Sequence, residues 1–266
     1  MNYFIEYYCI SHKGNVRSTN QDNYCCLGEY MPFDNNGSNG VITGITRNID
    51  DPIFAVFDGM GGEESGEMAA FIAARKLAEY KFEHDPPKEL FGYCKSANDE
   101  ICEYTEEHSL TSMGTTAAIL LFCKNKIFLC NIGDSKIFQF TDDAFRQISY
   151  DHISISAFGT KPPLTQNLGI KEDELIISPY TAIGDYHSND VYLICSDGLT
   201  DMISNDEIKN ILINTERANV AEALLQKALE NGGKDNITIL LLFINKEKNT
   251  FINRLKRNMR CVNGNK

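Results

Sequence analysis

Residues 52–62 of this chain read PIFAVFDGMGG, an apolar run followed by an acid and three glycines around a methionine. Its first six residues are an apolar run typical of a buried strand, which we expect to end sharply at Asp58-Gly59. The residues that follow predict a helix, because 68–80 combine good helix formers with an apolar spacing of three and four. Acidic side chains suit the first turn of such a helix, and the sequence supplies Glu63, Glu64 and Glu67.

Further apolar runs on both sides of this stretch predict strands that come in blocks apart from the helical segments. Strands are expected at 3–10, 23–27, 117–122, 127–132, 136–140, 191–195 and 237–244. Helices are expected at 87–107, 204–214 and 217–231. The three runs between 117 and 140 are separated by short turns and predict an antiparallel meander. Because strands and helices come in blocks, the pattern favours a sheet-rich α+β fold over a βαβ winding.

The composition excludes several classes of protein. The 266 residues include 25 basic and 37 acidic side chains, a net charge of −12, which argues against a nucleic-acid scaffold. No apolar stretch approaches the roughly 20 residues of a membrane span, and the first residues do not resemble a signal peptide. The nine cysteines form no CxxC pair, so we expect reduced thiols, a cytoplasmic location and a packing role for Cys195 rather than a reactive one.

The end of the chain differs in charge from the rest. Residues 246–266 carry seven basic side chains and one acidic one, so we divide the chain into a domain at 1–245 and a basic tail at 246–266. Phe251, Leu255 and Met259 recur at intervals of four, which is a weak amphipathic pattern. The tail is either a solvated, frayed terminus or a segment that docks on an anionic surface, such as a lipid face or an acidic partner.

Aspartates stand at the ends of the predicted strands. Three of them end or interrupt an apolar run beside a glycine, and two more precede such a run: Asp58, Asp134, Asp197, Asp22 and Asp235. A single Asp-Gly pair is most often a turn. Five such aspartates beside buried strands are better explained if the strand ends converge at one rim of packed sheets.

A cluster of carboxylates at one rim needs a counter-charge. Neighbouring like charges and burial both raise the pKa of a carboxyl group, and a divalent cation relieves both effects. Oxygen ligands favour Mg²⁺ or Mn²⁺, and the five histidines show no metal-binding spacing. Two such ions about 3.5–4 Å apart can activate a water for attack on a phosphate. Arg17, five residues before Asp22, is a candidate to hold the phosphate oxygens, although a surface loop position would also explain it.

The ordered set of these motifs resembles a known family, the metal-dependent Ser/Thr protein phosphatases of type 2C (PPM), and especially its compact bacterial members. The matching segments span residues 4–244 in the order of the family: RSTNQD (17–22), VFDGMGG (56–62), MGTTAA (113–118), NIGDSKIF (131–138), DH (151–152), LTQNLG (164–169), LICSDGLTD (193–201) and GGKDNITILL (232–241). The resemblance implies a four-layer α-β-β-α sandwich, in which helices flank two antiparallel sheets and a metal centre lies at one rim.

The resemblance also implies a role for each candidate residue. Two ions, Mn²⁺ or Mg²⁺, would be held by the first-motif acid Asp22, the bridging acid Asp58, the carbonyl of Gly59, and the acids Asp197 and Asp235. Asp134 matches the position of a third, weaker ion, and Arg17 matches the phosphate-binding arginine. The implied reaction is direct attack of a metal-bridged water on phosphoserine or phosphothreonine in proteins, which would be substrates of a Ser/Thr kinase.

The chain departs from the family pattern at several points. Gln21 stands where many relatives have Glu, Met60 where some have a His proposed as general acid, and Lys136 where Arg is usual. These changes predict weaker binding at one metal position, a metal-bound water as the leaving-group acid, and a looser structural ion pair. The flap over the site, at about 151–168, is short, and the long loop or loose hairpin at 31–50 is expected to replace part of it.

Two classes of function are compatible with the sequence. The first is an active phosphoprotein phosphatase, and the alternative is a catalytically weak module of the same fold that senses a partner. Because every position matched to a core metal ligand is intact and Arg17 is present, we favour the enzyme.

Overall fold

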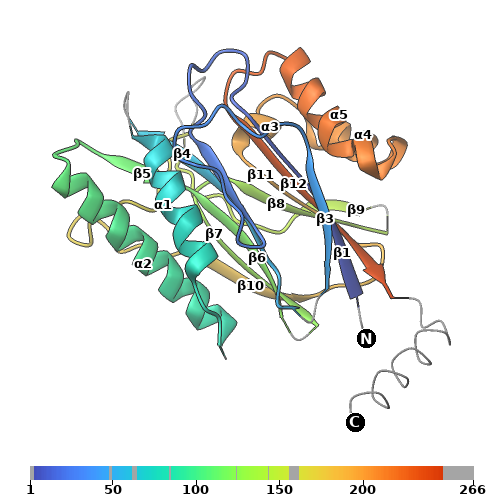
Figure 1. Cartoon of the computed structure of the whole chain (residues 1–266), viewed down its shortest axis with the longest axis horizontal. Coiled ribbons are helices and arrows are strands. Elements are labelled where there is room, and N and C mark those ends of the chain that lie inside the picture. The colour runs from blue at the N-terminus through green and yellow to red at the C-terminus, as the bar shows by residue number, and fades with distance from the viewer. Residues whose placement is uncertain are drawn as a thin grey trace, which may run out of the picture.

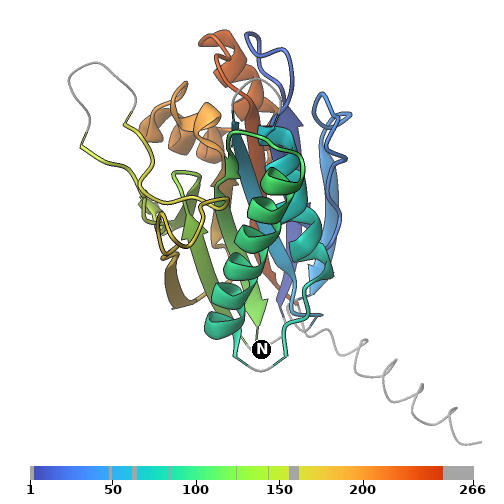
Figure 2. The same ribbon diagram turned by 90° about the vertical axis from the view of Figure 1, so that its left-hand side faces the viewer.

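The computed structural model describes residues 3–47, 50–61, 65–83, 85–123, 125–142, 144–155 and 162–247. These residues form two antiparallel β-sheets stacked face to face, with helices on both outer sides (Figures 1 and 2). The expected four-layer α+β sandwich is therefore confirmed.

The first sheet has six strands in the order β3-β1-β12-β11-β8-β9. Their bounds are β3 Ile42–Arg47, β1 Tyr3–His12, β12 Ile237–Lys246, β11 Val191–Cys195, β8 Lys136–Thr141 and β9 Ala144–Gln147. The pairing of β1 with β12 joins the first and last described strands of the chain. The outer side of this sheet is covered by α3 (Asp197–Thr200), α4 (Asn205–Asn214) and α5 (Arg217–Glu230).

The second sheet runs in the order β10-β7-β6-β4-β2, and the short strand β5 pairs with the end of β4. Their bounds are β10 Tyr180–Asp185, β7 Lys126–Ile132, β6 Ala117–Cys123, β4 Ile53–Gly61, β2 Asp22–Cys26 and β5 Met113–Thr115. The outer side is covered by α1 (Gly66–Glu79) and α2 (Pro86–Glu107), which lie side by side in Figure 1.

The inner strands are apolar on both faces because both faces are covered. In β6, Ala118, Leu120 and Phe122 point into the layer between the sheets, whereas Ala117 and Ile119 point toward the helices. All seven residues of β6 are buried. This double coverage explains why the central strands read as continuous apolar runs rather than as alternating ones.

The strand of the opening motif is longer than predicted. β4 continues beyond the acid–glycine pair to Gly61, because β5 pairs with its last three residues. The helix that follows begins at Gly66, so Glu67 lies in its first turn. The other two acids expected in that turn, Glu63 and Glu64, lie outside the described residues.

The meander predicted over 117–140 is wrong in its last strand. β6 and β7 pair as expected, but β8 belongs to the other sheet, where it pairs with β11 and β9. The chain changes sheet at Gly133, whose φ of +96° favours glycine and where a Cβ would lie 2.5 Å from the Thr116 side chain. Short apolar runs predict strands without indicating which sheet each strand joins.

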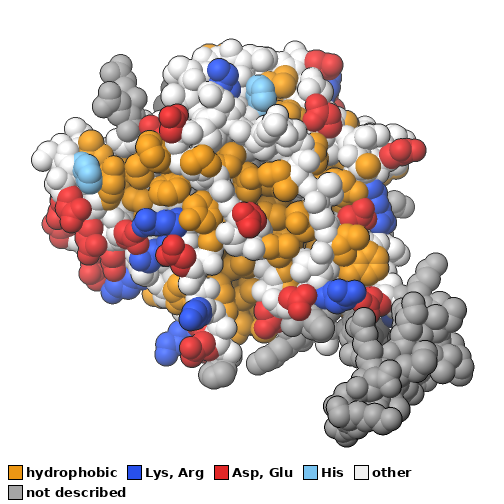
Figure 3. Space-filling view, viewed as in Figure 1, with side chains coloured by type: hydrophobic (Ala, Val, Ile, Leu, Met, Phe, Trp, Pro, Cys, Tyr) orange, Lys and Arg blue, Asp and Glu red, His pale blue; other side chains and the backbone are white. Residues whose placement is uncertain are grey.

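The segment at 31–50, predicted as a loop or loose hairpin, contains β3, an edge strand paired with β1. The residues before β3 pack on α1 through aromatic rings, since the ring centroids of Tyr30 and Phe33 lie 5.8 and 6.1 Å from that of Phe71. Figure 3, which shows the molecule from the same side as Figure 1, has apolar side chains across the middle of the view. None of the described residues of the segment lines the cavity at the rim, so these residues do not replace the flap.

The cysteines are packing residues. All eight cysteines among the described residues are free, and all but Cys102 are buried. Burial raises the pKa of the Cys195 thiol, which disfavours the reactive thiolate.

Two predictions fall wholly or partly outside the described residues. β12 ends at Lys246, and residues 248–266 are not described, so the domain boundary and the docking of the tail stay predictions. The centre of the flap, 156–161, is also outside. In the described part of the chain, no helix combines the length and apolar character needed to cross a bilayer.

Candidate active site

A cavity of about 240 Å³ opens at one rim of the sandwich. Its walls come from segments far apart in the sequence: Arg17, Gln21, Asp58, Gly59, Met60, Gly61, Asp134, Pro162, Leu164, Asp197 and Asp235. Four of the five predicted aspartates are among them, together with Gly59 and Arg17. The strand ends therefore converge as the sequence indicated; Asp22 lies beside Asp58 in the sheet, but it does not line the cavity.

Asp58 is held by the backbone and side chains of two threonines. Its carbonyl accepts hydrogen bonds from Thr116 N at 2.9 Å and Thr115 Oγ1 at 3.0 Å, and its N–H donates to Thr116 Oγ1 at 3.0 Å. Burial, followed by the nearby charge of Asp197, raises the pKa of the Asp58 carboxyl well above its ordinary value. The backbone of Asp58 is thus fixed, while burial and the neighbouring carboxylates disfavour ionisation of its side chain.

Gly59 lies where three stretches of backbone come close together. A Cβ at this position would lie 2.2 Å from the carbonyl oxygen of Gly66 and 2.4 Å from that of Gln21. Only glycine allows this approach, which keeps the backbone of residue 59 in the wall of the cavity.

Asp22 lies behind the cavity rather than in its wall. It pairs in register with Asp58, and its Oδ2 accepts hydrogen bonds from Ser196 Oγ and Thr238 Oγ1, both at 2.7 Å. Its Oδ1 is buried and has no hydrogen-bond partner among the described residues. Burial raises the pKa of this carboxyl to about 7. Asp22 therefore joins β2 to β11 and β12 beneath the site and leaves one oxygen unsatisfied.

Asp197 and Asp235 face the cavity from α3 and from the residues just before β12. Asp235 forms a bidentate pair with Arg17, whose Nε and Nη2 lie 2.9 and 2.8 Å from its two carboxylate oxygens. These hydrogen bonds raise the pKa of the Arg17 guanidinium, which therefore stays charged. The candidate phosphate-binding arginine and one candidate metal ligand are thus in direct contact.

The turn that carries Asp134 is anchored on both sides. His152 N donates to Gly133 O at 3.0 Å, and Gly133 N donates to His152 Nδ1 at 3.2 Å. The hydroxyls of Thr116 and Ser135 lie 2.6 Å apart on the other side. The start of the flap and Thr116, which lies between β5 and β6, together fix the position of this aspartate.

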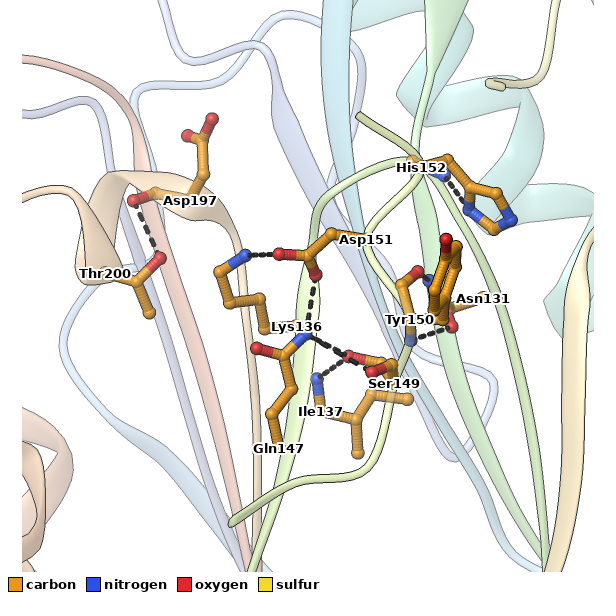
Figure 4. Close-up of polar contacts among 11 residues, drawn as sticks. Asn131, Lys136, Ile137, Gln147, Ser149, Tyr150, Asp151, His152, Asp197 and Thr200 are labelled. Carbon is orange, nitrogen blue, oxygen red and sulfur yellow. Dashed lines mark hydrogen bonds and ion pairs between the residues drawn. The ribbon is translucent and has the colours of Figure 1, made fainter. Parts of the chain in front are cut away.

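Lys136 and Gln147 together supply the two hydrogen-bond donors that one arginine guanidinium would supply. Lys136 Nζ forms an ion pair with Asp151 Oδ2, and Gln147 Nε2 donates to Asp151 Oδ1 at 2.6 Å (Figure 4). Both oxygens of Asp151 are therefore bonded, as a single arginine would bond them. The loosening expected from a lysine at position 136 is offset by a donor from β9.

Two further departures lie in the wall of the cavity. Gln21 Nε2 donates to Glu67 Oε2 at 3.0 Å, so a carboxylate from α1 stands behind the neutral amide. The thioether of Met60 cannot donate a proton. No histidine is among the described residues that line the cavity, so none of them can supply an imidazole as general acid.

Sequence reasoning missed the polar residues that hold the aspartates. Ser196 and Thr238 bond Asp22, and Asn236 Oδ1 accepts a hydrogen bond from Gln21 N at 2.8 Å. Each of the three is buried, in or beside an apolar strand run. A buried polar side chain requires a partner, so its place in an apolar run was the signal that could have identified it.

The donor set fits a hard divalent cation. The described wall offers carboxylate and carbonyl oxygens and neither thiol nor imidazole. Burial, and after it the neighbouring carboxylates, raises the pKa values of Asp22 and Asp58, and Oδ1 of Asp22 has no hydrogen-bond partner among the described residues. A cation at the rim would relieve the repulsion between these carboxylates. Within the described ranges, no three carboxylate, imidazole or thiol groups form a ready-made metal cluster. The oxygen donors therefore line one cavity, but they do not form a complete metal-coordination site among the described residues.

Comparisons with known proteins agree with this geometry. A family model described as "Protein phosphatase 2C" matches residues 43–231. The serine/threonine phosphatase stp of Listeria innocua is 30% identical over 223 residues, which cover 75% of this chain and 87% of that protein. The crystal structure of the Mycobacterium tuberculosis serine/threonine phosphatase PstP/Ppp has a TM-score of 0.74 at 26% identity and covers 91% of this chain and 100% of its own. The catalytic domain of PstP, solved in complex with two manganese ions, has a TM-score of 0.72 at 27% identity, with coverages of 92% and 100%.

Proposed function

The chain belongs to the protein phosphatase 2C family, and on that premise we propose that it is a metal-dependent phosphatase that hydrolyses phosphoserine and phosphothreonine in proteins. The observation that carries the proposal is the cavity in which four carboxylates, the backbone of Gly59 and the guanidinium of Arg17 meet. Hydrolysis of a phosphate ester needs oxygen donors for divalent cations and a cationic donor for the phosphate oxygens, and this cavity has both.

Two Mn²⁺ or Mg²⁺ ions are proposed to bind at Asp58, Gly59, Asp197 and Asp235, and a third, weaker ion at Asp134. The pair of manganese ions in the PstP structure supports the number two. When bound, such ions lower the pKa of a water and offset the charge of the phosphate. Because Asp22 does not line the cavity, we propose that it supports the ligand residues from behind, through its position beside Asp58 and its bonds to Ser196 and Thr238.

Arg17 is proposed to bind the phosphate of the substrate. A guanidinium has five N–H donors, and Asp235 accepts only two of them. The side chain is 53% exposed, so its remaining donors are accessible from solvent. The bidentate pair also restricts the motion of the side chain and holds it in the wall of the cavity.

Hydrolysis of p-nitrophenyl phosphate with Mn²⁺ tests the proposal, with EDTA as the metal-free condition. We expect Asp197→Asn to lower kcat/KM by about 100-fold or more, because a neutral amide is a weak ligand for a hard cation. Asp206→Asn, at an exposed aspartate of α4, is the matched control and should keep wild-type turnover.

Two results would contradict the proposal. Wild-type protein without Mn²⁺-dependent turnover would favour the alternative, a binding module of the same fold. Full turnover by the Asp197→Asn variant would show that the proposed ligands are wrong.

The substrates are proposed to be proteins phosphorylated by a Ser/Thr kinase in the cytoplasm. Phosphosites that accumulate when the gene is deleted should decline when the wild-type protein is restored. They should persist when the Asp197→Asn variant is supplied instead.

A further inference from the structure

The two described ends of the flap form a short antiparallel ladder beside the active site. Thr165 N donates to His152 O at 2.8 Å, and Ser154 N donates to Pro163 O at 3.0 Å. Between these bonds, Ile153 lies directly opposite Leu164. The two segments therefore behave as paired strands, and both are seen in yellow at the left of Figure 2.

The pairing determines which side chains share a face. Residues directly opposite each other in an antiparallel pair point to the same side, as do residues two apart along one strand. Ile153 and Leu164 therefore share one face with the residues two positions away: Ile155 and Pro162 on one side, and Asp151 and Gln166 on the other. Asp151 is already bonded to Lys136 and Gln147. Leu164 and Pro162 both line the active-site cavity, so this face is turned toward the site.

The part of this face formed by Ile153, Ile155, Pro162 and Leu164 is apolar, and the described residues leave it partly open to solvent. Ile155 is fully exposed at 101%, and Ile153 is 42% exposed. A single exposed apolar residue needs no explanation, but two exposed isoleucines beside the half-buried Pro162 and Leu164 form a candidate contact surface next to the cavity. We call this surface, formed by Ile153, Ile155, Pro162 and Leu164, the flap face.

We propose that the flap face binds a bulky apolar side chain of the substrate, within two positions of the phosphorylated residue. This inference rests on the proposed phosphatase activity, because the phosphate must occupy the cavity for its neighbours to reach the flap face. Continuity supports the assignment, since Pro162 and Leu164 belong to the walls of both. An acidic neighbour would find no cation on the flap face and would meet a chain with a net charge of −12. The substrate class is therefore a phosphopeptide with an apolar flank.

Phosphopeptides that differ only in the residues flanking phosphothreonine test this proposal. One peptide carries Leu at the positions within two residues on both sides, and the others carry Ser or Asp there. We expect the wild-type protein to show a kcat/KM about tenfold higher for the Leu peptide than for the Ser peptide, the scale typical of one apolar contact. The Asp peptide should be poorer than the Ser peptide.

Variants of the flap face then test whether the preference for the Leu peptide arises at this surface. Ile155→Ser should reduce the Leu-to-Ser ratio to near one, and Ile155→Leu should retain it. Ile183→Ser, at a 59% exposed isoleucine of β10, is the matched control and should keep the wild-type ratio. We divide the kcat/KM of each variant for each phosphopeptide by the kcat/KM of the same variant for p-nitrophenyl phosphate. This ratio removes effects of the substitution on the metal centre or on folding.

The results distinguish this inference from the proposed function. Mn²⁺-dependent turnover of p-nitrophenyl phosphate without any flank preference would overturn the inference and leave the phosphatase. A preference that survives Ile155→Ser would also overturn it, because the contact would then lie elsewhere. Absence of turnover toward every substrate would overturn both.

Discussion

Asp22 couples the stability of the fold to pH. Burial raises the pKa of its carboxyl from 3.8 to about 7, so the folded state holds a proton that the unfolded chain releases near its ordinary pKa. The stability that this group contributes is present below pH 3.8 and is lost as the pH rises through about 7. In EDTA, we expect Asp22→Asn to raise the free energy of unfolding by about 1–3 kcal/mol more at pH 8 than at pH 5. Urea unfolding at the two pH values measures this, and an equal change at both would contradict it.

We predict that Gln147 contributes to the free energy of unfolding because residue 136 is a lysine rather than an arginine. In the wild type, Gln147→Leu removes one of the two donors to the Asp151 carboxylate and should cost about 1 kcal/mol of unfolding free energy. In a Lys136→Arg background the guanidinium can bond both oxygens, so the same change should cost clearly less. A double-mutant cycle by urea unfolding measures this coupling. Equal costs in the two backgrounds would show that Gln147 does not complete the pair.

The contact between α3 and the start of β12 sets the spacing of two candidate ligands. A Cβ on Gly198 would lie 1.9 Å from the carbonyl oxygen of Asn236, so Gly198→Ala must push these elements apart. Asp197 precedes Gly198 in the chain, and Asp235 precedes Asn236. We therefore expect the variant's affinity for Mn²⁺, measured by calorimetry, to fall at least about tenfold. Gly92→Ala in α2, where the nearest atom is the hydroxyl of Tyr80 at 3.1 Å, is the control and should keep that affinity. Unchanged Mn²⁺ affinity in Gly198→Ala would contradict the proposed ligand spacing.

The whole molecule should gain stability from the cation that its rim accommodates. Ions that bind the folded state alone stabilise it by about 2.7 kcal/mol at 100 times their Kd. We therefore expect Mn²⁺ to raise the Tm of the wild-type protein, whereas NaCl of equal ionic strength should not reproduce the shift. Asp197→Asn should reduce the gain, and the exposed Asp206→Asn should retain it. A Tm that does not respond to Mn²⁺ would argue against metal binding at the cavity.

The amino-acid sequence was sufficient for the fold class and for most of the rim. Apolar runs and helix periodicity are local properties, so the central strands and the long helices lie close to where they were expected. An acid beside a glycine at the end of a buried strand is also a local signal. It identified Asp58, Asp134 and Asp197 without any knowledge of how the sheets pack.

The way in which these strands, helices and side chains face one another depends on the packing of the whole fold. The tertiary structure assigned β8 to the opposite sheet, placed Asp22 behind the cavity, paired Arg17 with Asp235, and paired Ile153 with Leu164 beside the cavity. Each of these facts depends on contacts between segments that are not neighbours along the chain. Local preferences determine that a strand forms, whereas the side chains that it meets depend on how all the layers pack together.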